Sequence, residues 1–141
     1  MVDEERVRLL LRRVTDDLAV LRSRAGVGPS RLLADRTLLD ALKYTLVTAV
    51  EGCVRVAQHL GASGSWRAPA TNADAFRVLG EHAVIDAELA DGLARAAGLR
   101  NLLVHAYAEL DDARVVAALD RLDDLDAFVD AVLAFAIAER D

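Results

Sequence analysis

Four polar side chains interrupt an apolar segment in the C-terminal half of the chain. Residues 98–111 read GLRNLLVHAYAELD and carry Arg100, Asn101, His105 and Tyr107. A helix that only filled a core would place Leu, Ala or Val at most of these positions. Because polar groups near a core need partners, these four residues require a chemical explanation.

Helical spacing gathers the four side chains on one side of the segment. Each helical residue advances about 100°, so Arg100 and Tyr107 share nearly one bearing, while Asn101 and His105 share a neighbouring one. All four then fall within roughly half of the circumference. We expect Leu102 and Leu103 to anchor the opposite side in the core. This arrangement requires that the helix stays regular as far as Tyr107.

Arginine and histidine together suit the cleavage of a phosphodiester. Arg100 offers a permanently charged fork of donors that matches a phosphate, and His105 can take and give a proton near neutral pH. RNA supplies its own nucleophile, the 2′-hydroxyl, so these groups could cut it without a metal or another cofactor. Asn101 would orient the imidazole or a phosphate oxygen. Spacing alone favours a solvated polar helix face over a catalytic role.

The composition predicts one all-α domain that spans residues 1–141. Hydrophobic residues make up 54% of the 141 residues, and most of the abundant residue types are good helix formers. The formal net charge of -6 argues against a broad basic surface that coats nucleic acid, because such binding neutralises many phosphates. Any contact with nucleic acid must therefore be local.

Cysteine content and hydropathy favour a cytoplasmic protein without a membrane span. Cys53 is the single cysteine, which excludes a disulfide framework and a thiolate metal cage. We expect it in the core as a small apolar residue. The N-terminus is acidic where a signal peptide would be basic, and no apolar run approaches the roughly 20 residues of a membrane span.

Apolar periodicity predicts an antiparallel four-helix bundle with an additional short helix. The first long helix is expected over about residues 3–25 and the second from near Asp35 to Leu60, where Gly61 ends it. Asp86 caps the third long helix, which carries the polar segment, and Asp111 or Asp112 caps the fourth. These expectations place the four polar residues on a long helix that packs against the bundle.

The connection between the second and third long helices holds the short helix. Thr71 and Asp74 form a capping box that opens it, and it should run through Leu79. Trp66 lies in the preceding loop and is expected to cover the end of the bundle. Gly92 and Gly98 should mark the close approach of another backbone, and Gly98 could also bend the helix before Arg100.

Two metal-based readings compete with the arginine and histidine chemistry. His59, His82 and His105 could form a zinc site, but none has a histidine partner at helical spacing. Instead, His59 should lie at the end of its helix and His82 in a turn. The acidic run ELDDARVVAALDRLDDLD could hold Mg²⁺, although a solvated helix face with charges at the helix start explains it better. We therefore expect no metal site.

The segment RNLLVHAY resembles the R-x-x-x-x-H-x-Y motif of the HEPN superfamily, specifically its HepT-like ribonuclease toxins. Asn commonly follows the Arg in that motif. The resemblance also includes AVEGCVRVAQHLGA, the stretch from NADAFRVLGEHAV to the motif, and the closing amphipathic helix. It covers nearly the whole chain in order and spacing.

This resemblance implies a homodimer in which the motifs of two protomers face each other in a cleft. Arg100 and His105 would be catalytic, with help from Asn101, and the substrate would be RNA. The family pairs each toxin with an MntA-type nucleotidyltransferase antitoxin that transfers AMP to the motif tyrosine, here Tyr107. Such a bulky anionic adduct would compete with RNA phosphate for the arginine.

The chain departs from the family pattern on the second long helix. Members typically carry an Asp near the position of Arg55, where this chain has a cation. If that Asp orients the catalytic arginine, Glu51, one turn earlier, is the alternative partner. The competing function is a non-catalytic helical module that binds nucleotide, RNA or a nucleotidyltransferase without cutting.

Overall fold

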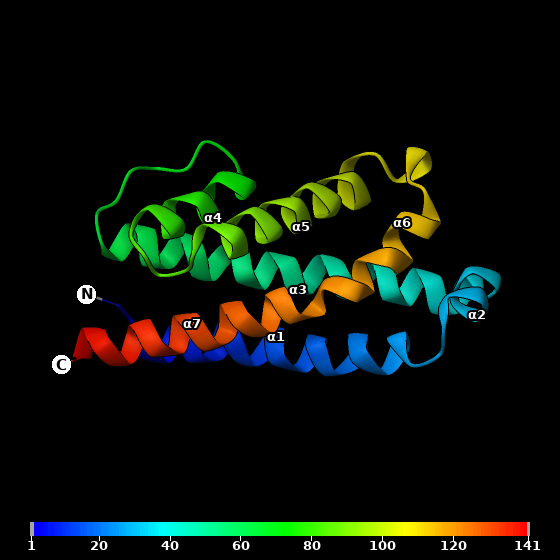
Figure 1. Ribbon diagram of the computed structural model, residues 1–141, viewed down its shortest axis with the longest axis horizontal. Coiled ribbons are helices and arrows are strands. Elements are labelled where there is room, and N and C mark those ends of the chain that lie inside the picture. Colours follow the sequence, from blue (N-terminus) through cyan, green and yellow to red (C-terminus); the bar gives the residue numbers. More distant parts are fainter. Residues whose placement is uncertain (1, 141) are drawn as a thin grey trace.

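The structure is a computed structural model that describes residues 2–140, apart from the side chains of Tyr107 and Arg140. The long helices run in alternating directions along the longest axis of the molecule (Figure 1). They are α1 (Glu4–Ala25), α3 (Arg36–Ser63), α5 (Ala87–His105) and α7 (Leu122–Arg140). Shorter helices join them: α2 (Pro29–Ala34), α4 (Asn72–Glu81) and α6 (Asp112–Ala117), with 3-10 turns η1 (Tyr107–Glu109) and η2 (Ala118–Arg121).

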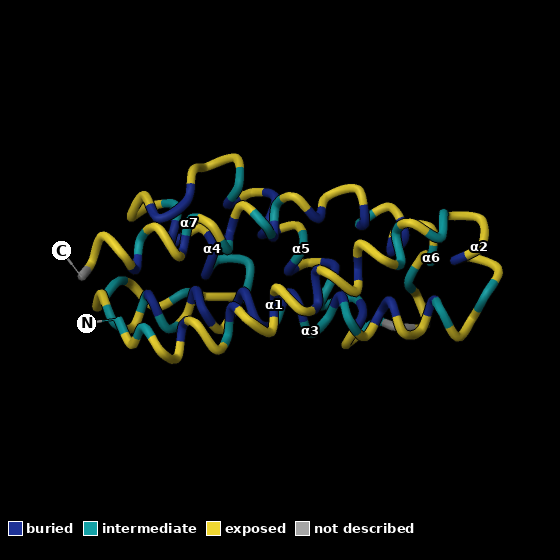
Figure 2. Tube along the Cα trace, turned by 90° about the horizontal axis from the view of Figure 1, so that it is seen from below, coloured by how far each residue is buried: buried dark blue, intermediate teal, exposed yellow. Residues whose placement is uncertain are grey.

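The long helices pack as a bundle around one apolar core. α1 packs against α3 and α7, and α5 packs against α3 and α7 from the other side. α4 covers α3 and α5, while α2 contacts α6 at the far end. Phe76 of α4 and Phe128 of α7 are fully buried and meet edge to face, with ring centroids 5.6 Å apart. Buried positions alternate with exposed ones along each long helix (Figure 2), as amphipathic helices require.

The expected all-α class is confirmed, since residues 2–140 contain helices and no strand. The prediction of a single short helix is wrong, because α2 and α6 add to α4. Pro29 occupies the first turn of α2, directly after Gly28, whose φ is 94°. A proline at the start of a helix is favoured because it has no N–H to leave unpaired, so the sequence GVGPS contained this signal.

Short polar side chains begin five of the helices, and the caps predicted at Thr71, Asp86 and Asp111 are confirmed. Each accepts a hydrogen bond from a backbone N–H of the first turn, which otherwise has no partner. The capping residues are Asp3 for α1, Asp35 for α3, Thr71 for α4, Asp86 for α5 and Asp111 for α6.

The sequence predicted that the second long helix ends at Gly61, but α3 continues to Ser63. A glycine inside a helix costs only about 1 kcal/mol, so Gly61 weakens the helix without ending it. The end comes at Gly64, where an added Cβ would lie 2.5 Å from the ring of Trp66. α4 likewise extends beyond the expected Leu79, to Glu81.

Trp66 closes the end of the bundle, as predicted. Its ring stacks on His82 with centroids 4.1 Å apart, and it meets Phe135 of α7 edge to face at 6.0 Å. His82 is the residue at which α4 ends. The loop before α4 is therefore packed against the core.

The two glycines of α5 differ from the prediction. A Cβ at Gly92 would lie 2.5 Å from Oδ2 of Asp124, so the close neighbour is a side chain and not a backbone. A Cβ at Gly98 would have nothing within 4 Å, so the predicted close approach there is wrong. In residues 2–140, no helix has the length and apolarity that a bilayer crossing needs.

Candidate active site

Helix α5 positions the polar segment by burying its opposite face. Leu99 and Leu103 belong to the core, whereas Leu102, which was also expected there, is only half-buried. Arg100 and Asn101 are half-buried beside this face, and His105 is exposed at the last residue of the helix. The helix therefore presents a sheltered cation and an accessible imidazole, one and a half turns apart.

The guanidinium of Arg100 is held by two neighbours. Nη2 and Nε donate to Oε1 of Glu51 on α3 at 2.6 and 3.2 Å, and Nη1 donates to Oδ1 of Asn101 at 3.0 Å. The side chains of Arg100 and Glu51 are 17% and 33% exposed. Such shielding strengthens a charge-assisted hydrogen bond relative to one in water.

This arrangement leaves part of the arginine available for a ligand. A guanidinium has five N–H donors, and these contacts use three of them. The remaining two N–H groups can donate to the oxygens of a phosphate. Glu51 and Asn101 thus fix the plane of the guanidinium and leave two of its five N–H donors for a ligand.

The acidic partner is Glu51, and not a residue near Arg55, where the family resemblance implied an Asp. Arg55 is exposed, one turn further along α3. The contact between Glu51 and Arg100 is the alternative that the sequence had left open. A carboxylate and the arginine therefore meet even though Arg55 is a cation.

The predicted common face of Arg100 and Tyr107 is wrong, because α5 ends at His105. Ala106 leaves the helix with φ -133° and ψ 39°, while its N–H bonds to the carbonyl of Leu102. Tyr107 begins the 3-10 turn η1, and its side chain lies outside the described part of the chain. Arg100, Asn101 and His105 therefore share a helix that the tyrosine does not.

A buried lysine ties the segment after η1 to the bundle. Nζ of Lys43 on α3 lies 2.7 Å from Oδ1 of Asp112, the first residue of α6. The lysine side chain is only 9% exposed. Lys43 falls within the apolar stripe of α3, between Leu42 and Leu46, and a cation in such a stripe was the signal that sequence reasoning missed.

Two of the three histidines that were considered as zinc ligands have other contacts. Nε2 of His59 accepts a hydrogen bond from the backbone N–H of Asp3 at 3.1 Å, and His82 stacks on Trp66. Within residues 2–140, no three His, Cys, Asp or Glu side chains gather in a way that could hold a metal ion. Cys53 is fully buried in the core, as expected, and burial together with the charge of Asp17 raises the pKa of its thiol.

The acidic run after residue 108 is used for caps and ion pairs. Asp111 caps α6 and Asp112 binds Lys43. Asp124 pairs with Arg121 at 3.1 Å, and Asp123 reaches Arg22 of α1 at 3.2 Å. The expected single last helix is broken into α6, η2 and α7.

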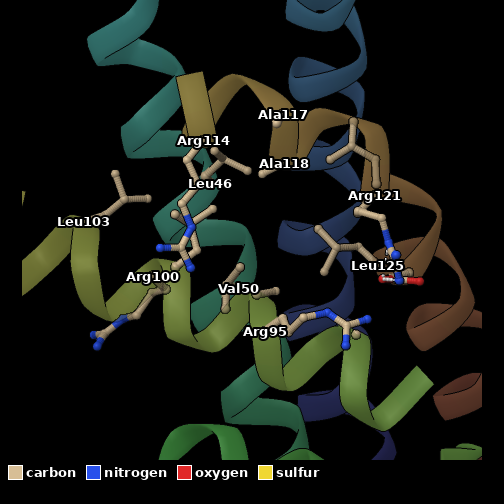
Figure 3. A pocket seen from close by; sticks show the side chains of 15 residues that line it. Leu46, Val50, Arg95, Arg100, Leu103, Arg114, Ala117, Ala118, Arg121 and Leu125 are labelled. Carbon is tan, nitrogen blue, oxygen red and sulfur yellow. Dashed lines mark hydrogen bonds and ion pairs between the residues drawn. The ribbon is translucent and has the colours of Figure 1, made fainter. Parts of the chain in front are cut away.

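A pocket of about 270 Å³ lies beside the stem of Arg100, between α3, α5 and the segment from α6 to α7. Its walls are aliphatic, and Arg95, Arg114 and Arg121 stand around it (Figure 3). Sequence reasoning did not find this cluster. The three arginines come from separate elements and share no spacing pattern, so only the folded chain brings them together.

This fold and site define a class of protein: an all-helical domain with an Arg-x-x-x-x-His motif at the end of its fifth helix. The family model described as "Ribonuclease HepT-like" matches residues 14–132. The chain therefore belongs to the HepT-like ribonuclease family.

Relatives and solved structures agree with this assignment. The mRNA nuclease HepT of Shewanella oneidensis is 32% identical over 106 residues, which cover 74% of this chain and 80% of that protein. The tri-AMPylated Shewanella oneidensis HEPN toxin, solved in complex with MNT antitoxin, is 27% identical with a TM-score of 0.85, over 95% of this chain and 99% of that one. The Bacillus subtilis cytosolic protein YutE shares the fold alone, with a TM-score of 0.87 at 17% identity, over 98% of this chain and 93% of that one.

Proposed function

We propose that this chain is the toxin of a toxin–antitoxin system, a metal-independent endoribonuclease that acts as a homodimer. Arg100 and His105 are its catalytic residues, and Asn101 assists them. The observation that carries this proposal is the guanidinium of Arg100, fixed by Glu51 with two N–H groups left over, on the same helix as an exposed imidazole. Because the chain belongs to a ribonuclease family, we assign these two side chains to the cleavage of RNA.

The reaction follows from the two side chains and from the substrate. The imidazole of His105 takes the proton of a ribose 2′-hydroxyl, whose oxygen attacks the adjacent phosphorus. The bond from phosphorus to the 5′-oxygen breaks, and that oxygen receives a proton from a protonated imidazole. This leaves a 2′,3′-cyclic phosphate and a 5′-hydroxyl end. Arg100 stabilises the negative charge that develops on the phosphate oxygens.

The proposed control is AMP transfer to Tyr107 by an MntA-like nucleotidyltransferase antitoxin. The tyrosine oxygen attacks the α-phosphate of ATP, and pyrophosphate leaves. A related toxin is known in tri-AMPylated form with its antitoxin. Because Tyr107 follows His105 by two residues, the anionic adduct would compete with RNA phosphate for Arg100.

Cleavage of total RNA in EDTA tests the catalytic proposal. The wild type should cut RNA, whereas Arg100→Ala and His105→Ala should lose at least about a hundred-fold in rate. Arg12→Ala, an exposed arginine of α1, is the matched control and should cleave as the wild type does. Activity that survives either site substitution refutes the assigned roles, and activity lost in EDTA indicates a metal.

Expression in a bacterial host separates this enzyme from the non-catalytic helical module. The wild type should arrest growth, and His105→Ala or the co-expressed antitoxin should relieve the arrest. With the antitoxin and ATP, intact mass should rise by whole AMP units, and Tyr107→Phe should abolish the increase. Harmless expression of the unmodified wild type would favour the binding module.

A further inference from the structure

The pocket beside Arg100 combines an apolar interior with a cationic rim. Leu46 and Val50 of α3, Leu99 of α5 and Leu125 of α7 line its interior. Figure 3 shows the side chains of Arg95, Arg114 and Arg121 arranged around this interior, each from a different element. An apolar hollow ringed by guanidinium groups suits a ligand with an apolar body and a negative charge.

Two of these arginines have no carboxylate partner among residues 2–140. Arg121 pairs with Asp124 at 3.1 Å. Arg95 and Arg114 are exposed, and within residues 2–140 neither makes an ion pair. In a chain with a net charge of -6, carboxylates are plentiful, so two unpaired guanidinium groups at one pocket favour an anionic ligand.

The size of the pocket limits what can enter it. Its volume of about 270 Å³ lies just below the roughly 300–1,000 Å³ of sites that enclose a whole small molecule. A planar ring system fits such a space, with the charged remainder of the ligand left at the rim. Guanidinium planes are surfaces on which unpaired nucleobases stack, and aliphatic walls remove the apolar face of a base from water.

We propose that this pocket, named here the base pocket, holds one nucleobase of the RNA strand next to the phosphate at Arg100, with neighbouring phosphates on Arg95 and Arg114. The inference rests on the proposed function, because it takes single-stranded RNA as the ligand. It adds a substrate-binding site that the Arg-x-x-x-x-His motif does not contain.

The base pocket is continuous with the candidate active site. The stem of Arg100 is part of the pocket wall, while its guanidinium points away from the pocket in Figure 3, toward Glu51. Arg95 precedes Arg100 by five residues, or about 7.5 Å along the helix axis. A strand whose phosphate lies on Arg100 can therefore reach Arg95 while an adjacent base enters the pocket.

Gly92 leaves room for the side chains of Asp124 and Arg121 at the edge of the pocket. A Cβ at this position would lie 2.5 Å from Oδ2 of Asp124 and 3.3 Å from Nη2 of Arg121, and all three residues line the pocket. The carboxylate can accept a hydrogen bond from an amino group of a base, and the guanidinium can donate to a base carbonyl or ring nitrogen. This pair is positioned to contact the edge of the bound base.

The test measures binding of a 2′-O-methyl RNA hexamer of mixed sequence, which lacks the attacking hydroxyl and cannot be cut. In Arg95→Ala/Arg114→Ala, affinity should fall at least about ten-fold, and the slope of log K against log salt should become shallower by about 1.4, for two lost phosphate contacts on a single strand. Arg12→Ala/Arg77→Ala removes two exposed arginines outside the pocket. This charge-matched control should retain nearly all of the affinity.

A second variant fills the pocket without changing charge. Ala117 is exposed on α6 and lines the pocket, whereas Ala113 of the same helix is exposed and does not. Ala117→Phe should weaken hexamer binding about ten-fold, as expected for the loss of one stacked base, and should leave the salt slope unchanged. Ala113→Phe should bind as the wild type does. Circular dichroism and thermal melting verify that each variant is folded.

Several results would overturn the base pocket. Equal hexamer affinities of Ala117→Phe and Ala113→Phe would show that no base binds in the pocket. Equal affinities of the two double variants would show that Arg95 and Arg114 do not bind phosphates. AMP that binds as tightly as the hexamer would assign the pocket to a free nucleotide. A change in sedimented mass for Ala117→Phe would make it a protein interface.

Cleavage by the wild type separates this proposal from the proposed function. If the wild type does not cut RNA but the hexamer results hold, the ribonuclease assignment fails and the base pocket stands. If the wild type cuts RNA and the pocket variants bind the hexamer normally, only the base pocket fails.

Discussion

A half-buried guanidinium is stable only while a carboxylate stays beside it. Arg100 is 17% exposed and lies 2.6 Å from Oε1 of Glu51. Removing the carboxylate leaves a partly desolvated cation without its counter-charge, and the guanidinium would then turn toward solvent or toward other acceptors. Glu51 is therefore a positioning residue in the proposed reaction, since it acts on RNA only through Arg100.

We expect Glu51→Gln to lower the rate constant for RNA cleavage by about ten- to hundred-fold, because small displacements of a catalytic group have effects of that size. Glu51→Asp should recover part of the loss. Arg55→Gln changes an exposed residue of the same helix and should cleave as the wild type does. The measurement is kcat and KM on a defined RNA. A Glu51→Gln enzyme with wild-type kcat would show that the ion pair does not orient the arginine.

Residue types and spacing revealed part of this site. Arg100, Asn101 and His105 stand out because polar groups interrupt an apolar helix. Glu51 was a candidate because it lies one turn before Arg55, near which the family resemblance implied an Asp. The arginines at 95, 114 and 121 carry no such pattern. They meet because α5 and the segment from α6 to α7 pack together, and single-sequence periodicity does not contain that packing.

Element boundaries were predictable where local chemistry sets them. Asp86 and Thr71 cap their helices through their own side chains, and such contacts span only a few residues. The end of α5 at His105 was not predictable in this way, because LVHAYAEL contains no glycine or proline. Tertiary contacts fix that region, among them the pair of Lys43 and Asp112.

The two glycines of α5 give a matched test of the packing. Gly98→Ala should raise the free energy of unfolding by about 0.5–1 kcal/mol, because alanine loses less backbone entropy in a helix and its Cβ meets nothing within 4 Å. Gly92→Ala loses equally little backbone entropy, but its Cβ would lie 2.5 Å from Asp124 and must displace that carboxylate. We expect no net stabilisation. Equal stabilisation of both variants in urea unfolding would contradict this packing.

The loop before α4 should give stability a pH-dependent component. Arg67 lies 2.7 Å from Asp74 and 2.7 Å from Glu81. Its hydrogen bonds hold the pKa of both carboxyl groups below their usual range. Because the folded pKa values lie below the unfolded values of about 3.9 and 4.3, this stabilisation is complete above those values and declines as pH falls below them.

Arg67→Met should therefore be less stable than the wild type at pH 7, and the difference should shrink at pH 4 and further at pH 3. Urea unfolding at the three pH values measures it. Arg36→Met, which breaks an exposed pair with Asp40 at 3.6 Å, is the control for loss of a surface arginine. A stability difference that does not change with pH would show that the two carboxyl groups contribute nothing.

At the scale of the whole molecule, charge is divided between an acidic surface and a local cationic site. The net charge of -6 disfavours non-specific binding to nucleic acid, while Arg95, Arg100 and Arg114 gather near one pocket. RNA would then bind only where these groups converge. A dimer that faces two such sites toward each other would concentrate the positive potential in one cleft.

The proposed shared cleft predicts that two inactive variants complement each other. In a mixed dimer, the Arg100→Ala chain keeps its histidine and the His105→Ala chain keeps its arginine. These two side chains lie on opposite protomers, so they can meet only across the twofold axis. Subunit exchange at equal concentrations produces half mixed dimers with one working site each, so cleavage should recover to about a quarter of the wild-type rate. Native mass spectrometry of tagged chains verifies the exchange, and each variant mixed with itself is the control. Mixed dimers that form and remain inactive would place both catalytic residues of a site on one protomer.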